Sequence, residues 1–176
     1  MEFAKIHEYD IGPELESKIL RLLTESFPGE YPTQRIYYKQ IPHLRYVAFD
    51  KDMLVAQVGL DYRVMNLNGQ MIKVLGIIDL CVSTEYRDKG IGSQLLKIIE
   101  GFSKEHEMDF LLLFADKIEV YRKNGYIRVK NTCVWTKIDE GHTLGVGEKE
   151  IRELMIKRVG TKDWNDGTLD MLGYLY

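Results

Sequence analysis

The sequence has 176 residues, of which 45% are hydrophobic, and this is enough to bury the core of one ordinary globular domain. Its formal net charge is −3 and its basic residues are scattered, which argues against a general nucleic-acid binder. It has no apolar segment long enough to cross a membrane and no recognisable signal peptide. We therefore expect a cytoplasmic protein with no membrane or nucleic-acid partner.

The N-terminal part of the chain is expected to form one strand and two helices. The strand covers residues 3–9. A first helix starts at Gly12-Pro13, because proline is tolerated at the first helical position, and ends at Pro28-Gly29. A short second helix, capped by Thr33, is expected over residues 31–40.

Strands dominate the next stretch. Residues 44–49 and 53–65 are predicted to form two strands, and Asn68-Gly69 is a strong two-residue hairpin signal because both residues tolerate positive φ. The hairpin leads into a strand over residues 71–82. An amphipathic helix over residues 89–106 is expected to follow it.

The second half of the sequence is also expected to contain both strands and helices. A buried strand is expected over residues 110–114, a short helix over 117–123 and the last core strands over 126–138. In the tail, residues 154–159 favour a strand, and residues 169–176 form an apolar closing segment.

Cysteine and histidine usage gives no sign of a metal site or a disulfide. The two cysteines, Cys81 and Cys133, lie in apolar strand-like contexts, which favours reduced core residues. The four histidines are dispersed without the spacing of metal ligands, so we expect no metal.

The most informative motif is the segment from Arg87 to Gly92, which lies between a predicted strand and a predicted helix. Backbone N–H groups and the positive end of the helix dipole meet at such a turn, which suits a phosphate. Glycines allow close approach of an anion, and Arg87 and Lys89 add positive charge. A turn whose glycines serve packing alone is the alternative. The segment matches neither a Walker A loop nor a dinucleotide fingerprint, whose third glycine would fall at Leu95.

These residues resemble the acetyl-CoA loop of the GNAT N-acetyltransferase superfamily, whose pattern is Gln/Arg-x-x-Gly-x-Gly/Ala. Arg87, Gly90 and Gly92 occupy the three defined positions. A second match follows, because Tyr121 lies four residues before the Gly125-Tyr126 pair, as in the late signature of that family. The chain departs from the family at Phe114, where many members carry an asparagine seven residues before the late tyrosine.

The resemblance covers about residues 3–137 and implies an α+β fold, a mixed central sheet flanked by helices. It also implies that strands 77–82 and 110–114 run parallel and splay apart around the pantetheine arm of acetyl-CoA. We expect a single domain over residues 1–176, with residues 141–176 as a C-terminal extension that packs near the acceptor side.

The resemblance implies direct transfer of an acetyl group from acetyl-CoA to an amine. The residues expected to bind acetyl-CoA are Leu80, Cys81, Val82, Arg87, Asp88, Lys89, Gly90, Ile91, Gly92 and Ser93. Cys81 has little support as a nucleophile, since no Cys-His arrangement is recognisable.

Tyr121 and Asp79 are the predicted catalytic residues. Tyr121 occupies the position where many family members keep a general acid, and its alternative role is packing beside the cofactor. Asp79 is an acid in an apolar strand, where burial would move its proton affinity into a useful range for a base. A structural carboxylate that accepts backbone hydrogen bonds is an equal alternative for Asp79.

The acceptor is expected to be a primary amine of a small molecule, with cationic amines such as polyamines and aminoglycosides as the candidates. A protein or peptide acceptor, or a non-catalytic acyl-CoA-binding module, are the alternatives. The tail is similar in outline to that of aminoglycoside 2′-N-acetyltransferases, which motivates the hypothesis that Tyr176 approaches the acceptor. A homo-oligomer is possible.

Overall fold

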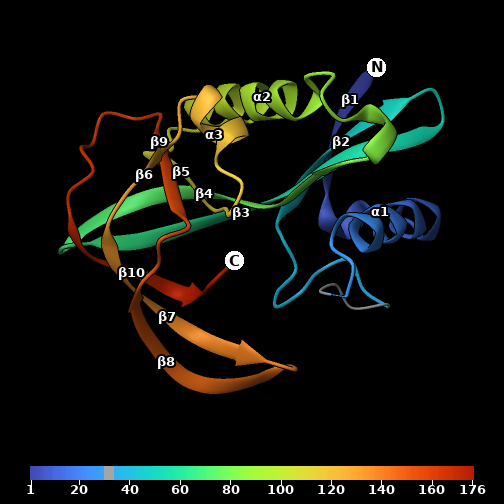
Figure 1. Ribbon diagram of the computed structural model, residues 1–176. Helices are drawn as coiled ribbons and strands as arrows, with labels where there is room; N and C mark the ends of the chain where they lie inside the picture. Colours follow the sequence, from blue (N-terminus) through green and yellow to red (C-terminus); the bar gives the residue numbers. More distant parts are fainter. Residues whose placement is uncertain (30–33) are drawn as a thin grey trace. The chain divides into compact units, whose positions relative to one another are not determined.

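The computed structural model describes residues 1–29 and 34–176, which divide into two compact units (Figure 1). The first unit comprises residues 1–61 and 77–97, and the second comprises residues 62–76 and 98–176. Three elements contribute residues to both units: strand β3 (Met53–Leu67), strand β4 (Gln70–Val82) and helix α2 (Ile91–Glu105). Neither unit is therefore a continuous piece of chain.

The first unit is a sheet covered by one N-terminal helix. Its further elements are β1 (Glu2–His7), a 3-10 turn (Glu8–Asp10), α1 (Pro13–Ser26), β2 (Leu44–Asp50) and a second 3-10 turn (Thr84–Tyr86). Strand β1 runs antiparallel to β2, and β2 runs antiparallel to β3. These strands confirm the sequence predictions to within a few residues.

Helix α1 begins at Pro13, as its sequence predicts, and buries one apolar face. Ile19, Leu22 and Leu23 recur at helical spacing and belong to the same buried cluster as Val47 of β2. This cluster anchors the helix to the sheet of the first unit.

The predicted second helix is wrong over the residues that the structure describes. Residues 34–40 form turns and bends, and the cap at Thr33 lies outside the described residues. Ile36 is buried, and its carbonyl accepts a hydrogen bond from Arg45 Nη2 at 2.6 Å. This carbonyl is therefore bound by a side chain from a distant strand, which the local sequence pattern does not reveal.

The second unit contains the rest of a mixed sheet. Its further elements are β5 (Phe110–Phe114), α3 (Glu119–Lys123), β6 (Ile127–Arg128), β7 (Asn131–Asp139), β8 (His142–Glu150), β9 (Leu154–Arg158) and β10 (Gly167–Tyr174). The strand order is β6-β9-β5-β4-β3-β10-β7-β8. Strands β4 and β5 pair in parallel over three residue pairs that end at Gly76 and Leu112. The parallel pairing and the mixed α+β sheet confirm the predicted fold class.

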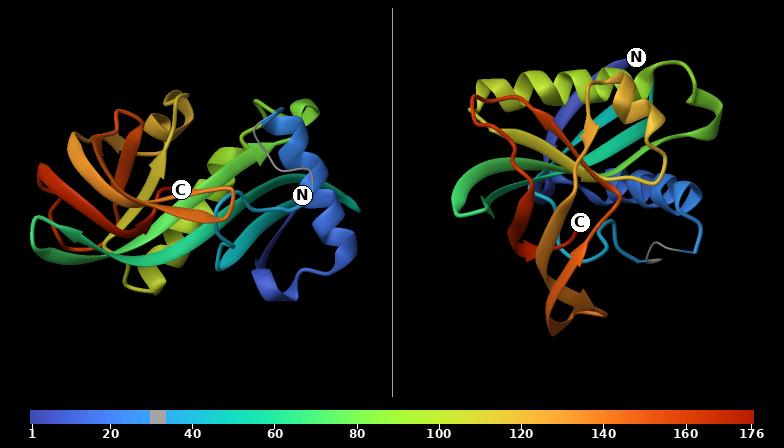
Figure 2. Two further views of the ribbon diagram at one scale, coloured as in Figure 1. Left: turned by 90° about the horizontal axis from the view of Figure 1, so that it is seen from below. Right: turned by 60° about the vertical axis from the view of Figure 1, so that its left-hand side comes forward.

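The extension from residue 141 onward is built into this sheet. Strand β9 pairs antiparallel with both β5 and β6, and it confirms the strand predicted in the tail. Strand β10 lies beside β7 in parallel orientation (Figures 1 and 2) and antiparallel to β3. Strand β8 was not predicted, because Gly145 and Gly147 leave it without an apolar alternation.

Two local predictions are confirmed in detail. Asn68 and Gly69 adopt φ angles of 51° and 88°, as the predicted two-residue hairpin requires. Cys81 and Cys133 are both free thiols and both buried. No helix among the described residues has the length and apolarity that a membrane crossing requires.

Candidate functional site

The loop between β4 and α2 has the backbone that the sequence motif predicts. Gly90 adopts φ of 79°, and a Cβ built on it would meet no atom within 4 Å, so the backbone is open on that side. Helix α2 starts at the next residue, and Gln94 N–H donates to the Gly90 carbonyl at 3.0 Å. The first N–H groups of a helix lack acceptors within the helix, so this opening presents donors to an anion.

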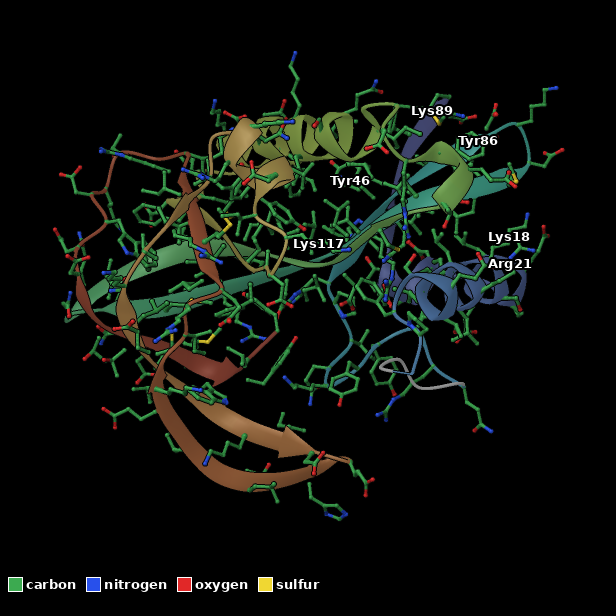
Figure 3. All side chains as sticks on the ribbon, viewed as in Figure 1. Lys18, Arg21, Tyr46, Tyr86, Lys89 and Lys117 are labelled. Carbon is green, nitrogen blue, oxygen red and sulfur yellow. The ribbon has the colours of Figure 1, made fainter. Side chains whose placement is uncertain are left out.

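Two basic side chains of this loop lie against the rest of the first unit. The Lys89 ammonium lies 4.7 Å from the centre of the Tyr86 ring (Figure 3). The Tyr86 hydroxyl donates to Asp50 at 2.7 Å, and this hydrogen bond raises the pKa of the Tyr86 phenol. Arg87 Nε donates to the Val82 carbonyl at 3.1 Å. The structure therefore brings both cations to the glycine turn while fixing the loop to β2 and β4.

Asp79 interrupts strand β4 with an unusual backbone conformation. Its φ is 52°, in the left-handed region that costs an L-residue about 1 kcal/mol or more. Its carbonyl accepts a hydrogen bond from Gln57 Nε2 at 2.6 Å. Four residues further on, directly after the end of β4, Ser83 N–H donates to the Val55 carbonyl of β3 at 2.8 Å. The strand is thus bent just before Leu80, Cys81 and Val82.

The Asp79 carboxylate interacts electrostatically with the Lys39 ammonium, which belongs to the irregular segment of residues 34–40. Burial lowers the pKa of the Lys39 ammonium, and the negative charge of Asp79 acts in the opposite direction. The two opposite charges therefore attract each other within the first unit.

Cys81 is a poor nucleophile in this environment. Its side chain is buried, and burial raises the pKa of the thiol to about 11. A thiol with that pKa is almost entirely protonated at neutral pH, which agrees with the absence of a Cys-His pair in the sequence.

Tyr121 lies on α3, in the second unit, and is half-buried. Its ring meets the Tyr126 ring edge to face at 5.9 Å, and its carbonyl accepts a hydrogen bond from Tyr126 N–H at 3.1 Å. The Tyr126 hydroxyl is buried and has no hydrogen-bond partner among the described residues. Burial raises the pKa of that phenol well above its usual value. The two rings of the late motif therefore pack against each other. Tyr126 is buried, and Tyr121 is partly accessible.

Tyr176 also packs inside the second unit. A Cβ added to Gly76 would collide with its ring, so the glycine in β4 makes room for this side chain. The Tyr176 ring lies 6.3 Å from the Phe114 ring, at the end of β5. Arg63 stacks on both Tyr174 and Tyr176, at 3.7 and 4.6 Å from their ring centres. An aromatic and cationic cluster therefore lies where the β4–β5 pairing ends.

Sequence reasoning missed the buried polar residues behind Asp79. Gln57 and Arg45 are 0% and 1% exposed, although each lies on an otherwise apolar strand. A single long polar side chain inside a run such as residues 54–60 is the signal that could have identified them, because such groups are rarely buried without a partner.

The family model for the acetyltransferase (GNAT) domain matches residues 10–129, which include both sequence motifs. No curated protein sequence is similar enough to this chain to count as a match.

Solved structures with this fold share little sequence with the chain. A GNAT family N-acetyltransferase of Escherichia coli, solved in complex with CoA, has a TM-score of 0.68 at 15% identity over 97% of this chain and 88% of its own. The ribosomal-protein-alanine N-acetyltransferase of Escherichia coli has a TM-score of 0.62 at 11% identity, over 93% of this chain and 98% of its own.

A third solved structure is much longer than this chain. It is a GCN5-related N-acetyltransferase of Anabaena variabilis, with a TM-score of 0.64 at 20% identity. The match covers 76% of this chain but 34% of that protein, so the chain spans about a third of its length. These likenesses concern the fold, whereas the family model covers more than half of the sequence. The chain belongs to the GNAT acetyltransferase family.

Proposed function

We propose that this chain transfers an acetyl group from acetyl-CoA directly to the primary amine of a small molecule. The observation that carries the proposal is the loop from Arg87 to Gly92, with its open glycine backbone, two cations and the start of α2. This donor set fits a pyrophosphate, which carries negative charge and accepts hydrogen bonds. Family membership supports the same co-substrate.

The residues proposed to hold acetyl-CoA fall into two groups. Arg87 to Ser93 would bind the phosphates through backbone N–H groups and positive charge. Leu80, Cys81 and Val82 would lie along the pantetheine arm, and a backbone N–H of this strand would donate to the thioester carbonyl as it gains negative charge. The buried Cys81 thiol would contribute shape rather than reactivity.

Asp79 and Tyr121 are proposed to move the protons. A lysine-like amine has a pKa near 10.4, so it arrives as an ammonium and must lose a proton, which Asp79 accepts. The amine nitrogen then bonds to the thioester carbon while the carbon–sulfur bond breaks. Tyr121 donates a proton to the leaving sulfur and regains one from the attacking nitrogen, so the net reaction releases one proton to water. A phenol near pKa 10 gives a proton to a thiolate near 8.5 at a cost of about 2 kcal/mol, which a positioned hydrogen bond offsets.

The acceptor is proposed to be a small cationic amine. The support is local: the Asp79 carboxylate and the Lys39 ammonium attract each other, and a cationic amine would be attracted to Asp79 in the same way. A protein acceptor is the second candidate, because one solved structure of similar fold is a ribosomal-protein-alanine N-acetyltransferase. The buried free thiols support a reducing compartment, and we propose the cytoplasm.

The proposal is tested by measuring thiol release from acetyl-CoA in the presence of pooled amines. The pools are polyamines, aminoglycosides, amino acids and short peptides, and CoA binding is measured in parallel by calorimetry. Release with a small-molecule pool supports the proposal, and release with peptides alone supports the second candidate. CoA binding without release in any pool contradicts the enzymatic proposal, and no CoA binding contradicts the assignment of the loop.

Cys81→Ala is expected to keep turnover within about twofold of wild type, because the reaction needs no covalent step on this thiol. Since the pKa of Cys81 is about 11, roughly one thiol in a thousand is ionised at pH 8. Iodoacetamide at pH 8 is therefore expected to leave the wild-type enzyme active over an hour. Rapid inactivation that Cys81→Ala abolishes would contradict this reading of the site.

A further inference from the structure

A chain of buried polar side chains leads from the edge of the first unit to Asp79. Glu8 receives two hydrogen bonds from Arg45, from Nε at 2.8 Å and from Nη2 at 2.9 Å. Arg45 Nη1 donates to Gln57 Oε1 at 2.7 Å, and Gln57 Nε2 donates to the Asp79 carbonyl at 2.6 Å. Four segments, the turn after β1 and strands β2, β3 and β4, are thus joined by side chains rather than by backbone alone.

Strand register explains how these residues meet. Arg45 pairs with Gly59, so Gln57 is its diagonal neighbour two residues along β3 and shares its face. Ile6 pairs with Arg45 on the other side, so Glu8 is again two residues further along. The register of β1, β2 and β3 therefore brings Glu8, Arg45 and Gln57 together.

The direction of every hydrogen bond in this chain is fixed by Arg45. A guanidinium can only donate, so Gln57 must turn its oxygen toward Arg45. Its amide nitrogen then has to point the other way, at the Asp79 carbonyl. The bidentate pair with Glu8 holds the guanidinium in place, and burial makes an unsatisfied group in the chain costly.

Among the residues joined by these hydrogen bonds, Asp79 has an unusual backbone conformation that a hydrogen bond to its carbonyl can stabilise. Its φ of 52° is one that few L-residues adopt, and loss of the hydrogen bond from Gln57 would favour a rotation toward the ordinary extended conformation. That rotation would swing the side chain of Asp79 to the other side of the strand.

We infer that Arg45 and Gln57 are positioning residues for the acetyl transfer, because they hold the Asp79 peptide and thereby aim its carboxylate at the amine. The inference rests on the proposed role of Asp79 as the base. It adds that this base is positioned by a series of hydrogen bonds that runs from Glu8 through Arg45 and Gln57, none of which is proposed to contact the substrate.

Two substitutions at Gln57 test this positioning role. Gln57→Glu keeps an oxygen for Arg45, and Gln57→Met adds no charge, so the two variants share the loss of the amide N–H groups that reach the Asp79 carbonyl at 2.6 Å and the Cys81 sulfur at 3.5 Å. Each is expected to lower kcat about tenfold or more while the Kd for CoA and the KM for acetyl-CoA stay within twofold. A second readout needs no turnover: the Leu80 amide signal in a nitrogen–proton NMR spectrum should shift in both variants, because Leu80 N–H shares the peptide plane of the Asp79 carbonyl.

The double variants with Asp79→Asn separate positioning from a general loss of structure. Asp79→Asn tolerates the same backbone and removes the base, so it should lower kcat, and a Gln57 change added to it should lower kcat no further. Additive losses, or a wild-type kcat in both Gln57 variants, would overturn the inference. A wild-type kcat in Asp79→Asn would overturn both the inference and the proposed base. Absence of transfer in the wild type would refute the proposed function, and a Leu80 signal that shifts in neither Gln57 variant would separately refute the claim that Gln57 holds the Asp79 peptide.

Asp109→Asn is the matched control for stability. Asp109 is buried in the second unit, where its carboxylate accepts hydrogen bonds from Lys73 N–H at 2.7 Å and from Lys162 Nζ at 3.0 Å. The substitution should lower the melting temperature, as the Gln57 changes do, without changing kcat or the Leu80 signal. A fall in kcat in this control equal to that of Gln57→Glu would show that lost stability alone explains both.

Discussion

Gly92→Glu is expected to abolish CoA binding while the protein stays folded. The folded chain has room for the side chain, since the nearest atom to a Cβ at this position is Val82 Cγ2 at 3.9 Å. A glutamate in the first turn of a helix also interacts favourably with the helix dipole, so stability should not fall. The same carboxylate would meet the CoA phosphates with like charge, and we expect calorimetry to show a loss of affinity of at least about 100-fold, or about 2.7 kcal/mol.

Gly101→Glu is the matched control on the same helix. Gly101 has no atom within 4 Å of a built Cβ, and it is an exposed residue ten positions after the first residue of α2. Replacing it should leave CoA affinity unchanged and raise stability slightly, because glycine is a poor helix former. Equal losses of affinity in the two variants would show that α2 does not bind phosphate through its first turn.

Tyr121→Phe is expected to lower kcat about 100-fold with little change in the affinity for CoA. The phenol donates a proton to the leaving sulfur in the proposed reaction, and general acids contribute factors of this size. Because the ring remains, its edge-to-face contact with Tyr126 is kept. Steady-state kinetics and calorimetry on the same preparations measure the two quantities.

Tyr126→Phe makes the identical chemical change on the adjacent ring. Its hydroxyl is buried without a hydrogen-bond partner among the described residues, so removing it should keep kcat and leave stability equal or higher. The assignment of the acid to Tyr121 is contradicted if Tyr126→Phe is the slower enzyme.

Predictions succeeded where structure depends on neighbours in the sequence. The Asn68-Gly69 turn and the opening of α2 after Gly90 both follow from the φ angles that these residues tolerate. The parallel pairing of β4 with β5 follows from a helix placed between two strands. A short helix is predicted over residues 117–123, and Tyr121 of the late motif lies on α3.

Predictions failed where a distant residue decides the outcome. Residues 34–40 contain aromatics that could cover a helix face, but the Ile36 carbonyl is bound by Arg45 from another strand. Asp79 has a left-handed conformation, and its carbonyl is likewise bound by a distant side chain, Gln57, 22 residues earlier in the sequence. Neither contact leaves a periodic pattern in the local sequence, since hydrophobic periodicity reports which face is buried and not which polar groups meet inside.

The positions of β9 and β10 have a consequence for how the protein is made. Both strands come late in the chain, yet β9 lies between β5 and β6, and β10 lies between β3 and β7. Until residues 154–174 have left the ribosome, the edges of β3 and β5 have no neighbour on that side, and apolar residues such as Met65 and Leu67 stay uncovered. The sheet therefore cannot close before these late strands are available, and a chain truncated before residue 154 would keep both edges exposed and be prone to aggregate.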